Sequence, residues 1–238
     1  MALLEVIQMP NPALRKPSRK VMHVDDELRQ LVADMAETMV KYDGVGLAAI
    51  QVGVPKRLIL VRVPEVVEEK LDVAEAEAIL KGEDAEAKKG IFRITIEKAD
   101  DPEADFVVTY IRRSIIWSEP FVCINPRVVE KEGLVIDDEG CLSDMGYLAK
   151  VERARKVVVV GYDIDMKPIK HEAAGLEARC LQHEIDHLDG ILYTDRMMED
   201  TRKKTAGADD GEGEGEGESE GECPITDDSD KREIISKK

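Results

Sequence analysis

The chain has 238 residues, of which 43% are hydrophobic, enough for a real core in one large domain or two small ones. Its formal net charge of -17 provides no electrostatic footprint for direct binding to nucleic acid phosphates. The four cysteines include no C-x-x-C pair, and no apolar run resembles a signal peptide or membrane span, so we expect a soluble, cytoplasmic protein.

The first quarter of the chain contains an arm, a helix and a strand. Prolines at positions 10, 12 and 17 predict an extended arm over residues 5–20. Apolar residues at helical spacing predict an amphipathic helix from Asp25 or Asp26 to Gly44. Small residues then surround Gln51, and glycines there would let a ligand approach the backbone, although a plain tight connection has the same composition. Residues 57–63 predict a strand.

The middle of the chain predicts an insertion followed by more strands. Residues 65–81 are rich in Glu and Ala and favour a helix, whereas 91–97 and 106–116 favour two strands of a hairpin. Within the body, strands are expected at 121–124, 127–131, 156–162 and 169–173. The fold class that follows is α+β, with mixed, mainly antiparallel sheets around a helix near residue 175 and an inserted helix plus hairpin at 64–119.

That helix carries the strongest chemical motif. Leu176, Cys180, His183 and His187 fall on one stripe, and the two histidines, four apart, suit a single metal ion. Glu184 completes an H-E-x-x-H arrangement and would serve as a base for a water in the metal's open position. The competing interpretation is a helix that carries two histidines by chance.

Two histidines leave a tetrahedral metal one protein ligand short. A protease of the H-E-x-x-H-x-x-G-x-x-H class would have a histidine where this chain has Tyr193, and Glu199 is the nearest downstream glutamate. His23 and His171 lack a supporting pattern, and we expect them at the surface. Cys141 is the better third ligand, because a thiolate is an excellent donor to zinc or ferrous iron.

Three stretches together resemble the peptide deformylase family. They are Gly44–Gln51 (GVGLAAIQ), Glu139–Ser143 (EGCLS) and Gln182–His187 (QHEIDH), and the arm around Asn11–Lys16 also looks like the family's start. The similarity covers roughly residues 3–63 and 120–198. The resemblance implies hydrolytic removal of the formyl group from N-formylmethionine at the start of new polypeptides.

The resemblance also implies roles for individual residues. One divalent ion per chain, Fe²⁺ in vivo with Zn²⁺, Ni²⁺ or Co²⁺ as alternatives, would be held by three ligands, and Glu184 would handle protons. The Gln51 amide and the backbone N–H of Leu142 would stabilise the oxyanion. Glu139 and Arg153 would form a supporting ion pair. The ligands are Cys141, His183 and His187, and the residues that pair with the substrate as an added strand are Val45, Gly46 and Gly140. The methionine side chain would enter an apolar pocket bordered by Val45, Leu142 and the helix face near Cys180 and His183.

Three features depart from the family pattern. Asp144-Met145-Gly146 replaces the usual apolar residue, proline and glycine after Cys-Leu-Ser, the 64–119 insertion is longer than usual, and the chain ends in an acidic tail instead of a basic helix. Residues 207–238 hold 12 acidic and 4 basic residues, a net charge of -8, so we expect a catalytic domain at 1–206 and a disordered tail at 207–238. Expected partners are N-formylmethionyl nascent peptides and, transiently, the ribosome exit region, with no nucleic acid or membrane. The alternative functions are a zinc endopeptidase and a catalytically silent module that binds peptide N-termini.

Overall fold

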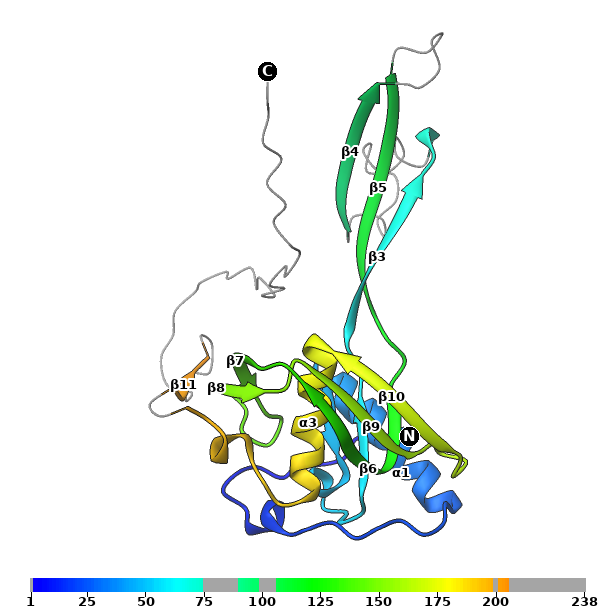
Figure 1. Cartoon of the computed structure of the whole chain (residues 1–238). Coiled ribbons are helices and arrows are strands. Elements are labelled where there is room, and N and C mark those ends of the chain that lie inside the picture. The colour runs from blue at the N-terminus through cyan, green and yellow to red at the C-terminus, as the bar shows by residue number, and fades with distance from the viewer. Residues whose placement is uncertain (1, 75–89, 99–105, 199–200, 206–238) are drawn as a thin grey trace, which may run out of the picture. The chain divides into compact units, whose positions relative to one another are not determined.

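The structure is a computed structural model of the whole chain, and it describes residues 2–74, 90–98, 106–198 and 201–205 (Figure 1). The chain divides into two units, Met1–Ala206 and Gly207–Lys238, and the second unit lies outside the described residues together with the expected tail. No helix among the described residues is long and apolar enough to span a membrane.

The described elements are few helices and many strands. Helices α1 and α3 span Asp26–Lys41 and Gly175–Leu188, and short 3-10 turns cover Pro12–Arg15 (η1), Ala49–Val52 (η2) and Tyr193–Asp195 (η4). The strands are β1 Gly46–Ala48, β2 Leu58–Val61, β3 Pro64–Leu71, β4 Gly90–Lys98, β5 Phe106–Trp117, β6 Phe121–Glu132, β7 Val135–Gly140, β8 Tyr147–Arg153, β9 Lys156–Tyr162, β10 Pro168–Ala174 and β11 Lys203–Lys204.

The strands form three sheets in which every pairing of named strands is antiparallel. The sheet orders are β1-β2-β6-β9-β10, β11-β8-β7 and β3-β5-β4. This mixed architecture of few helices and mainly antiparallel sheets confirms the expected fold class at that level.

Two helices cover opposite faces of the five-stranded sheet, and β2 shows why. Its residues alternate between faces: Leu58 and Leu60 pack in one cluster with Met35 of α1, whereas Ile59 packs in the other with Leu181 of α3. All four residues of β2 are buried, as a strand between two layers must be. Burial of each such aliphatic side chain stabilises the fold by roughly 1.5–3 kcal/mol.

The predicted helix boundaries are largely confirmed. The Asp25 side chain accepts a hydrogen bond from the Leu28 N–H and caps α1, which ends at Lys41, slightly before the predicted stop at Gly44. Helix α3 begins at Gly175 as expected and ends at Leu188. Gly190 follows with φ +74°, and a side chain there would meet the Arg15 carbonyl oxygen at 2.3 Å, so only glycine fits.

The insertion differs from its prediction. The expected helix at 65–81 is wrong over its first part, because Pro64–Leu71 is a strand (β3) paired with β5, and 75–89 lie outside the described residues. Pairing with a long neighbouring strand overrides the helical preference of a Glu- and Lys-rich stretch. The two strands expected at 91–97 and 106–116 are confirmed as β4 and β5, and the turn predicted at 98–103 lies largely outside the described residues.

The strands expected at 121–124 and 127–131 are one continuous strand, β6. Its pairing with β9 shifts between Ile124 and Arg127, and Asn125 has φ +51°. Pro126 lacks the N–H that a regular ladder needs, and this accounts for the irregularity without ending the strand.

Candidate metal centre and its pocket

Three side chains from two segments converge in the body of the protein. Helix α3 carries His183 and His187 one turn apart, and Cys141 directly follows β7. The Nε2 atom of His187 lies 3.0 Å from Nε2 of His183 and 3.2 Å from Sγ of Cys141. The donor atoms of all three lie within 4.8 Å of one another. The structure therefore brings together the three residues that the sequence nominated as ligands.

This donor set fits a divalent metal ion. One thiol and two imidazoles are the ligand types that zinc and ferrous iron accept. His187 presents Nε2 to the other two donor atoms, while its second ring nitrogen, Nδ1, is buried without a hydrogen-bond partner among the described residues. Burial and the neighbouring His183 lower the pKa of His187 well below its usual value, which keeps its ring neutral, as a ligand must be.

Behind the histidines lies a buried network of charges. Glu139 accepts hydrogen bonds from Arg153 at 2.6 and 3.0 Å, and its Oε1 lies 2.6 Å from His183 Nδ1. Arg153 also bonds Asp186, which in turn accepts two bonds from Arg196. The predicted Glu139–Arg153 ion pair is confirmed. The network fixes the ring of His183 with Nε2 toward the other donors.

The charges in this network hold one another in their ionised forms. Burial alone would raise the pKa of Glu139, but His183 and Arg153 outweigh it and lower this pKa to about 2. Burial likewise opposes the charge on His183, and Cys141 and Glu139 overcome it, so the pKa of His183 lies well above its usual value in the absence of a metal.

Glu184 extends from the same helix into a tight space. Its side chain is buried, and its Oε2 has no hydrogen-bond partner among the described residues. Burial raises the pKa of Glu184 to about 7, so this carboxyl exchanges a proton near neutral pH. A Cβ atom on Gly46 would lie 2.3 Å from Glu184 Oε1, so any larger residue at this position would force the Glu184 side chain to shift.

The amide of Gln51 is held in one orientation. Its Oε1 accepts a hydrogen bond of 2.7 Å from the N–H of Ala48, which turns the amino group toward Cys141 Sγ at 3.4 Å and Ser143 Oγ at 3.2 Å. An N–H donor is thereby directed at the cluster. The short 3-10 turn η2, which follows β1 directly, places Gln51 there.

The N-terminal arm ties these segments together. The N–H groups of Ile7 and Met9 donate to the carbonyl oxygens of Gln51 and Ser143, and the Gln8 side chain donates to the Leu142 carbonyl. Apart from η1, the arm has no helix, as its prolines predict. The arm thus acts as a bridge between the glycine-rich segment and the cysteine loop.

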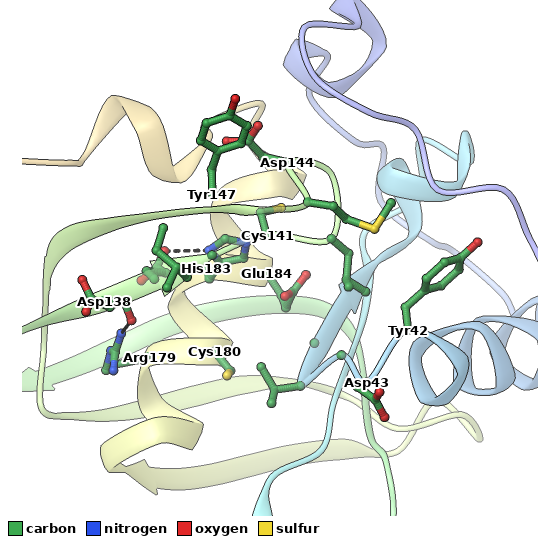
Figure 2. Close-up of a pocket in the computed structure, with 18 of the residues that line it drawn as sticks. Tyr42, Asp43, Asp138, Cys141, Asp144, Tyr147, Arg179, Cys180, His183 and Glu184 are labelled. Carbon is green, nitrogen blue, oxygen red and sulfur yellow. Dashed lines mark hydrogen bonds and ion pairs between the residues drawn. The ribbon is translucent and has the colours of Figure 1, made fainter. Parts of the chain in front are cut away.

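A cavity of about 550 Å³ opens beside the cluster (Figure 2). Eight of the nine nominated site residues line it, and the ninth, His187, contacts Cys141 at 3.2 Å but does not line the cavity. Leu176, expected to face inward, is 41% exposed at this cavity instead of buried. The residues that line it are Val45, Gly46, Gln51, Gly140, Cys141, Leu142, His183 and Glu184. Cys180 also lines it, as expected.

Several lining residues escaped the sequence analysis. Arg179 and Asp138 border the cavity, and Asp144 accepts hydrogen bonds from Tyr193 and Arg202 beneath its rim. The guanidinium group of Arg202 also lies over the ring of Tyr147, 4.0 Å from its centroid. The signal for Asp144 was present as a departure from the family pattern, but its partners are 49 and 58 residues away, and nothing local indicates them.

The other candidate ligands do not join the cluster. The hydroxyl of Tyr193 is committed to Asp144, and Glu199 lies outside the described residues. His23 is exposed, as expected. His171 is partly buried, stacks on Phe121 and lies 2.8 Å from Glu177, so its expected surface position is only partly confirmed.

Comparisons with known proteins agree with this geometry. Residues 3–203 match the family model described as polypeptide deformylase. A peptide deformylase from Alkalilimnicola ehrlichii is 35% identical over 204 residues, covering 86% of this chain and 87% of the relative. The crystal structure of a peptide deformylase from Ehrlichia chaffeensis superposes with a TM-score of 0.60 at 32% identity, covering 83% of this chain and 89% of that one. The crystal structure of a peptide deformylase from Synechococcus elongatus, solved in complex with actinonin, has a TM-score of 0.57 at 32% identity. The match covers 83% of this chain and 80% of that chain.

Proposed function

Since this chain belongs to the polypeptide deformylase family, we propose that the cavity beside Cys141, His183 and His187 is its active site. The enzyme removes the N-formyl group from N-formylmethionyl nascent peptides and releases formate. The observation that carries the assignment of the site is that the three donor atoms lie together beside the cavity that Cys141, His183 and Glu184 line.

The family implies one divalent metal ion, and we propose that Cys141, His183 and His187 hold it. When bound, such an ion acidifies a water molecule and polarises the formyl carbonyl. We propose Fe²⁺ as the ion in vivo, with Zn²⁺, Ni²⁺ and Co²⁺ as functional substitutes. Zinc binds such sites more tightly than ferrous iron, so the use of iron would reflect availability and reactivity.

Glu184 acts as the proton carrier. Its carboxylate can accept a proton from the attacking water, and its acid form can donate one to the departing amine. Burial, which raises the pKa of Glu184 in the metal-free protein, opposes the lowering of this pKa by a bound cation. The missing partner of Oε2 among the described residues leaves that oxygen available for this exchange. The amide N–H of Gln51 and the backbone N–H of Leu142 stabilise the oxyanion that forms at the formyl carbon.

The substrate backbone is held by close approach to the chain. We propose that the peptide pairs with the backbone of Val45, Gly46 and Gly140 as an added strand, while the first side chain enters the cavity. A Cβ atom on Gly140 would lie 2.8 Å from Leu148 Cδ2 and 3.2 Å from the Tyr147 carbonyl oxygen, so a side chain there would crowd this wall as well.

One assay separates this function from the alternatives. The protein is purified anaerobically and loaded with Fe²⁺, Ni²⁺ or Zn²⁺ in turn, and formate release is followed from a formyl-Met peptide alongside the unformylated peptide. We expect formate with at least one metal and no cleavage of the unformylated peptide. Glu184→Gln should abolish formate release while the variant retains its metal.

Each competing function has its own signature in this assay. Internal cleavage of the unformylated peptide would support a zinc endopeptidase, and peptide binding without formate release would support a silent binding module. Absence of formate with every metal would refute the proposed function.

The setting of the reaction is also a proposal. We place the activity in the cytoplasm, with transient contact to the ribosome exit region and no direct binding to nucleic acid. The segment 207–238, which lies outside the described residues, has a net charge of -8 and should be repelled by ribosomal RNA. Sedimentation with ribosomes should therefore be no stronger for the full chain than for a version ending at residue 206, and stronger binding of the full chain would overturn this proposal.

A further inference from the structure

Two charged residues that line the active-site cavity have no part in the proposed reaction, and each has a buried polar atom without a hydrogen-bond partner among the described residues. Among the described residues, five buried side-chain nitrogen or oxygen atoms lack a hydrogen-bond partner, and three of them belong to residues that line this cavity. Glu184 is one of the three residues, and its role is proton transfer. The others are Arg179, through Nε, and Asp138, through Oδ1. They mark a polar end of the cavity, where both are labelled in Figure 2.

The guanidinium group of Arg179 is fixed in place. The residue is buried, and it spans from α3 to β7, where it donates hydrogen bonds to the Asp137 carboxylate and the Asp138 carbonyl, both at 2.5 Å. These contacts leave Nε without an acceptor. The Asp138 carboxylate is also held, because its Oδ2 lies 3.3 Å from both Lys150 and Lys203.

Arg179 lies one helical turn before His183, on the same face of α3. Four residues of helix advance by roughly 6 Å. In a formylmethionyl peptide, five covalent bonds separate the formyl carbon from the thioether sulfur, a reach of about 6 Å for an extended chain. A first side chain that enters the cavity from the cluster and runs along α3 toward its N-terminus would therefore bring its sulfur to the level of Arg179.

We infer that Arg179 is a specificity-determining residue that lets the cavity accept a first side chain with a hydrogen-bond acceptor at the level of the methionine sulfur, as in methionine sulfoxide. This inference rests on the proposed function. Oxidation converts methionine into a polar, chiral side chain, which a wholly apolar cavity would reject. Here the sulfoxide oxygen accepts a hydrogen bond from the buried guanidinium group, and hydrolysis of the formyl amide is otherwise the same.

The test compares substrates within one preparation of metal-loaded enzyme. Formate release is measured for peptides that begin with formyl-Met, formyl-norleucine and each epimer of formyl-methionine sulfoxide. The readout is kcat/KM for the sulfoxide divided by kcat/KM for methionine. This ratio does not depend on the fraction of protein that is folded, so a partly unstable variant still reports on specificity.

Wild-type enzyme should process one sulfoxide epimer at a kcat/KM within about tenfold of that for methionine, because a hydrogen bond to a charged group offsets the cost of burying the oxygen. In Arg179→Met the ratio for that epimer should fall about tenfold or more, and the preference between epimers should disappear. The norleucine side chain has no hydrogen-bond acceptor. The ratio of kcat/KM for the formyl-norleucine peptide to kcat/KM for the formyl-Met peptide should therefore be the same in wild type and in Arg179→Met.

The matched control is Arg57→Met. Arg57 also forms an ion pair that anchors α3, with Asp189 at 2.5 Å, but it does not line the cavity, so its substitution should leave the ratio unchanged. Equal sulfoxide ratios in wild type and Arg179→Met, with formyl-Met still processed, would overturn the inference alone. Absence of formate from every substrate would refute the proposed function, and the inference with it.

Discussion

The position of the Glu184 carboxylate depends on the absence of a side chain at Gly46. A methyl group at this position would lie 2.3 Å from Glu184 Oε1, so the Glu184 carboxylate, which lines the cavity, would have to shift. The sequence indicates the glycine only as a place for close backbone approach. The structure identifies the neighbour that requires it, a carboxylate 138 positions later in the chain.

We expect Gly46→Ala to lower kcat/KM for formyl-Met peptide by about a hundredfold, since it displaces a reacting carboxylate by up to an ångström. Gly175→Ala is the control, because Gly175 has φ +58° but nothing within 4 Å of the place that a Cβ atom would occupy. That variant should lose about 1–2 kcal/mol of unfolding free energy and no activity. Full activity in Gly46→Ala would contradict the tight packing of β1 against Glu184.

Glu184 should also make the stability of the metal-free protein depend on pH. Burial raises its pKa from 4.5 to about 7, so the folded state keeps a proton that the unfolded chain releases above pH 4.5. The resulting stabilisation is complete below pH 4.5 and is lost as the pH rises through 7.

The difference in unfolding free energy between wild type and Glu184→Gln should therefore shift by on the order of 3 kcal/mol between pH 4.5 and 8, with wild type losing stability. Urea unfolding of chelator-treated protein measures it. A bound divalent cation lowers the pKa of a nearby carboxyl, so reloading the metal should flatten the dependence. Parallel stability profiles for the two metal-free proteins would contradict the raised pKa.

At the scale of elements, one arginine joins β7, β8 and α3. Arg153 of β8 is 4% exposed, and it neutralises Glu139 of β7 and Asp186 of α3. Removal of such a buried partner leaves charges that water cannot reach. The sequence supported only the pair with Glu139, through the family resemblance, because the contact with Asp186 depends on how a helix packs against a strand.

Arg153→Met should cost about 3–5 kcal/mol of unfolding free energy, because it takes from buried Glu139 its arginine partner and leaves Asp186 with Arg196 alone. It should also weaken metal binding about 10- to 100-fold, since Glu139 would no longer be held against His183. Arg113→Met provides the comparison, because its ion pair with Glu68 is 41% and 48% exposed and should contribute about 1 kcal/mol or less. Similar losses in both variants, by calorimetry and chelator competition, would argue against a special role for the buried network.

The elements also show where sequence patterns succeed and fail. Helix α3 was predictable, because its histidines, its apolar stripe and Gly190 are local features. Strand β3 was not, because Glu65, Glu68 and Glu69 favour a helix when taken alone, and only the register with β5 makes the stretch a strand. Val66 and Val67 were the available signal.

For the candidate site, the sequence predicted the residues that belong to motifs, but it did not predict the charged residues that form part of the cavity wall. Cys141, His183 and Glu184 belong to recognisable patterns. Arg179 and Asp138 look like ordinary surface charges in the sequence, and they become part of the cavity only when β7 packs beside α3. A long-range contact of this kind leaves no trace in local spacing.

At the scale of the whole molecule, the 64–119 segment connects two neighbouring strands of the main sheet. Strands β2 and β6 pair directly through Val61 and Phe121, and the segment closes on itself through hydrogen bonds between Val63 and Ser118. Two antiparallel neighbours need only a short hairpin connection, so the fold of the body does not require the inserted sheet.

Replacement of residues 65–116 by a short Asn-Gly turn should therefore leave a folded enzyme. Trp117, whose ring lies 4.2 Å from the guanidinium group of Arg62, is retained in this design. We expect a cooperative thermal transition and kcat/KM for formyl-Met peptide within about threefold of the full chain, given the usual tolerance of connections between adjacent strands. A folded variant without activity would assign the insertion a part in catalysis.

The contacts of the N-terminal arm determine how early during synthesis the protein can complete its fold. Gln8 bonds a carbonyl 134 residues later, and Arg15 pairs with Asp195, 180 residues later. At a synthesis rate of about 5–20 residues per second, Asp195 is made roughly 10 to 40 seconds after Arg15. The donor atoms likewise meet only after His187 has been translated. A growing copy of this chain therefore cannot assemble the three donor atoms, or hold an ion between them, before His187 has been translated.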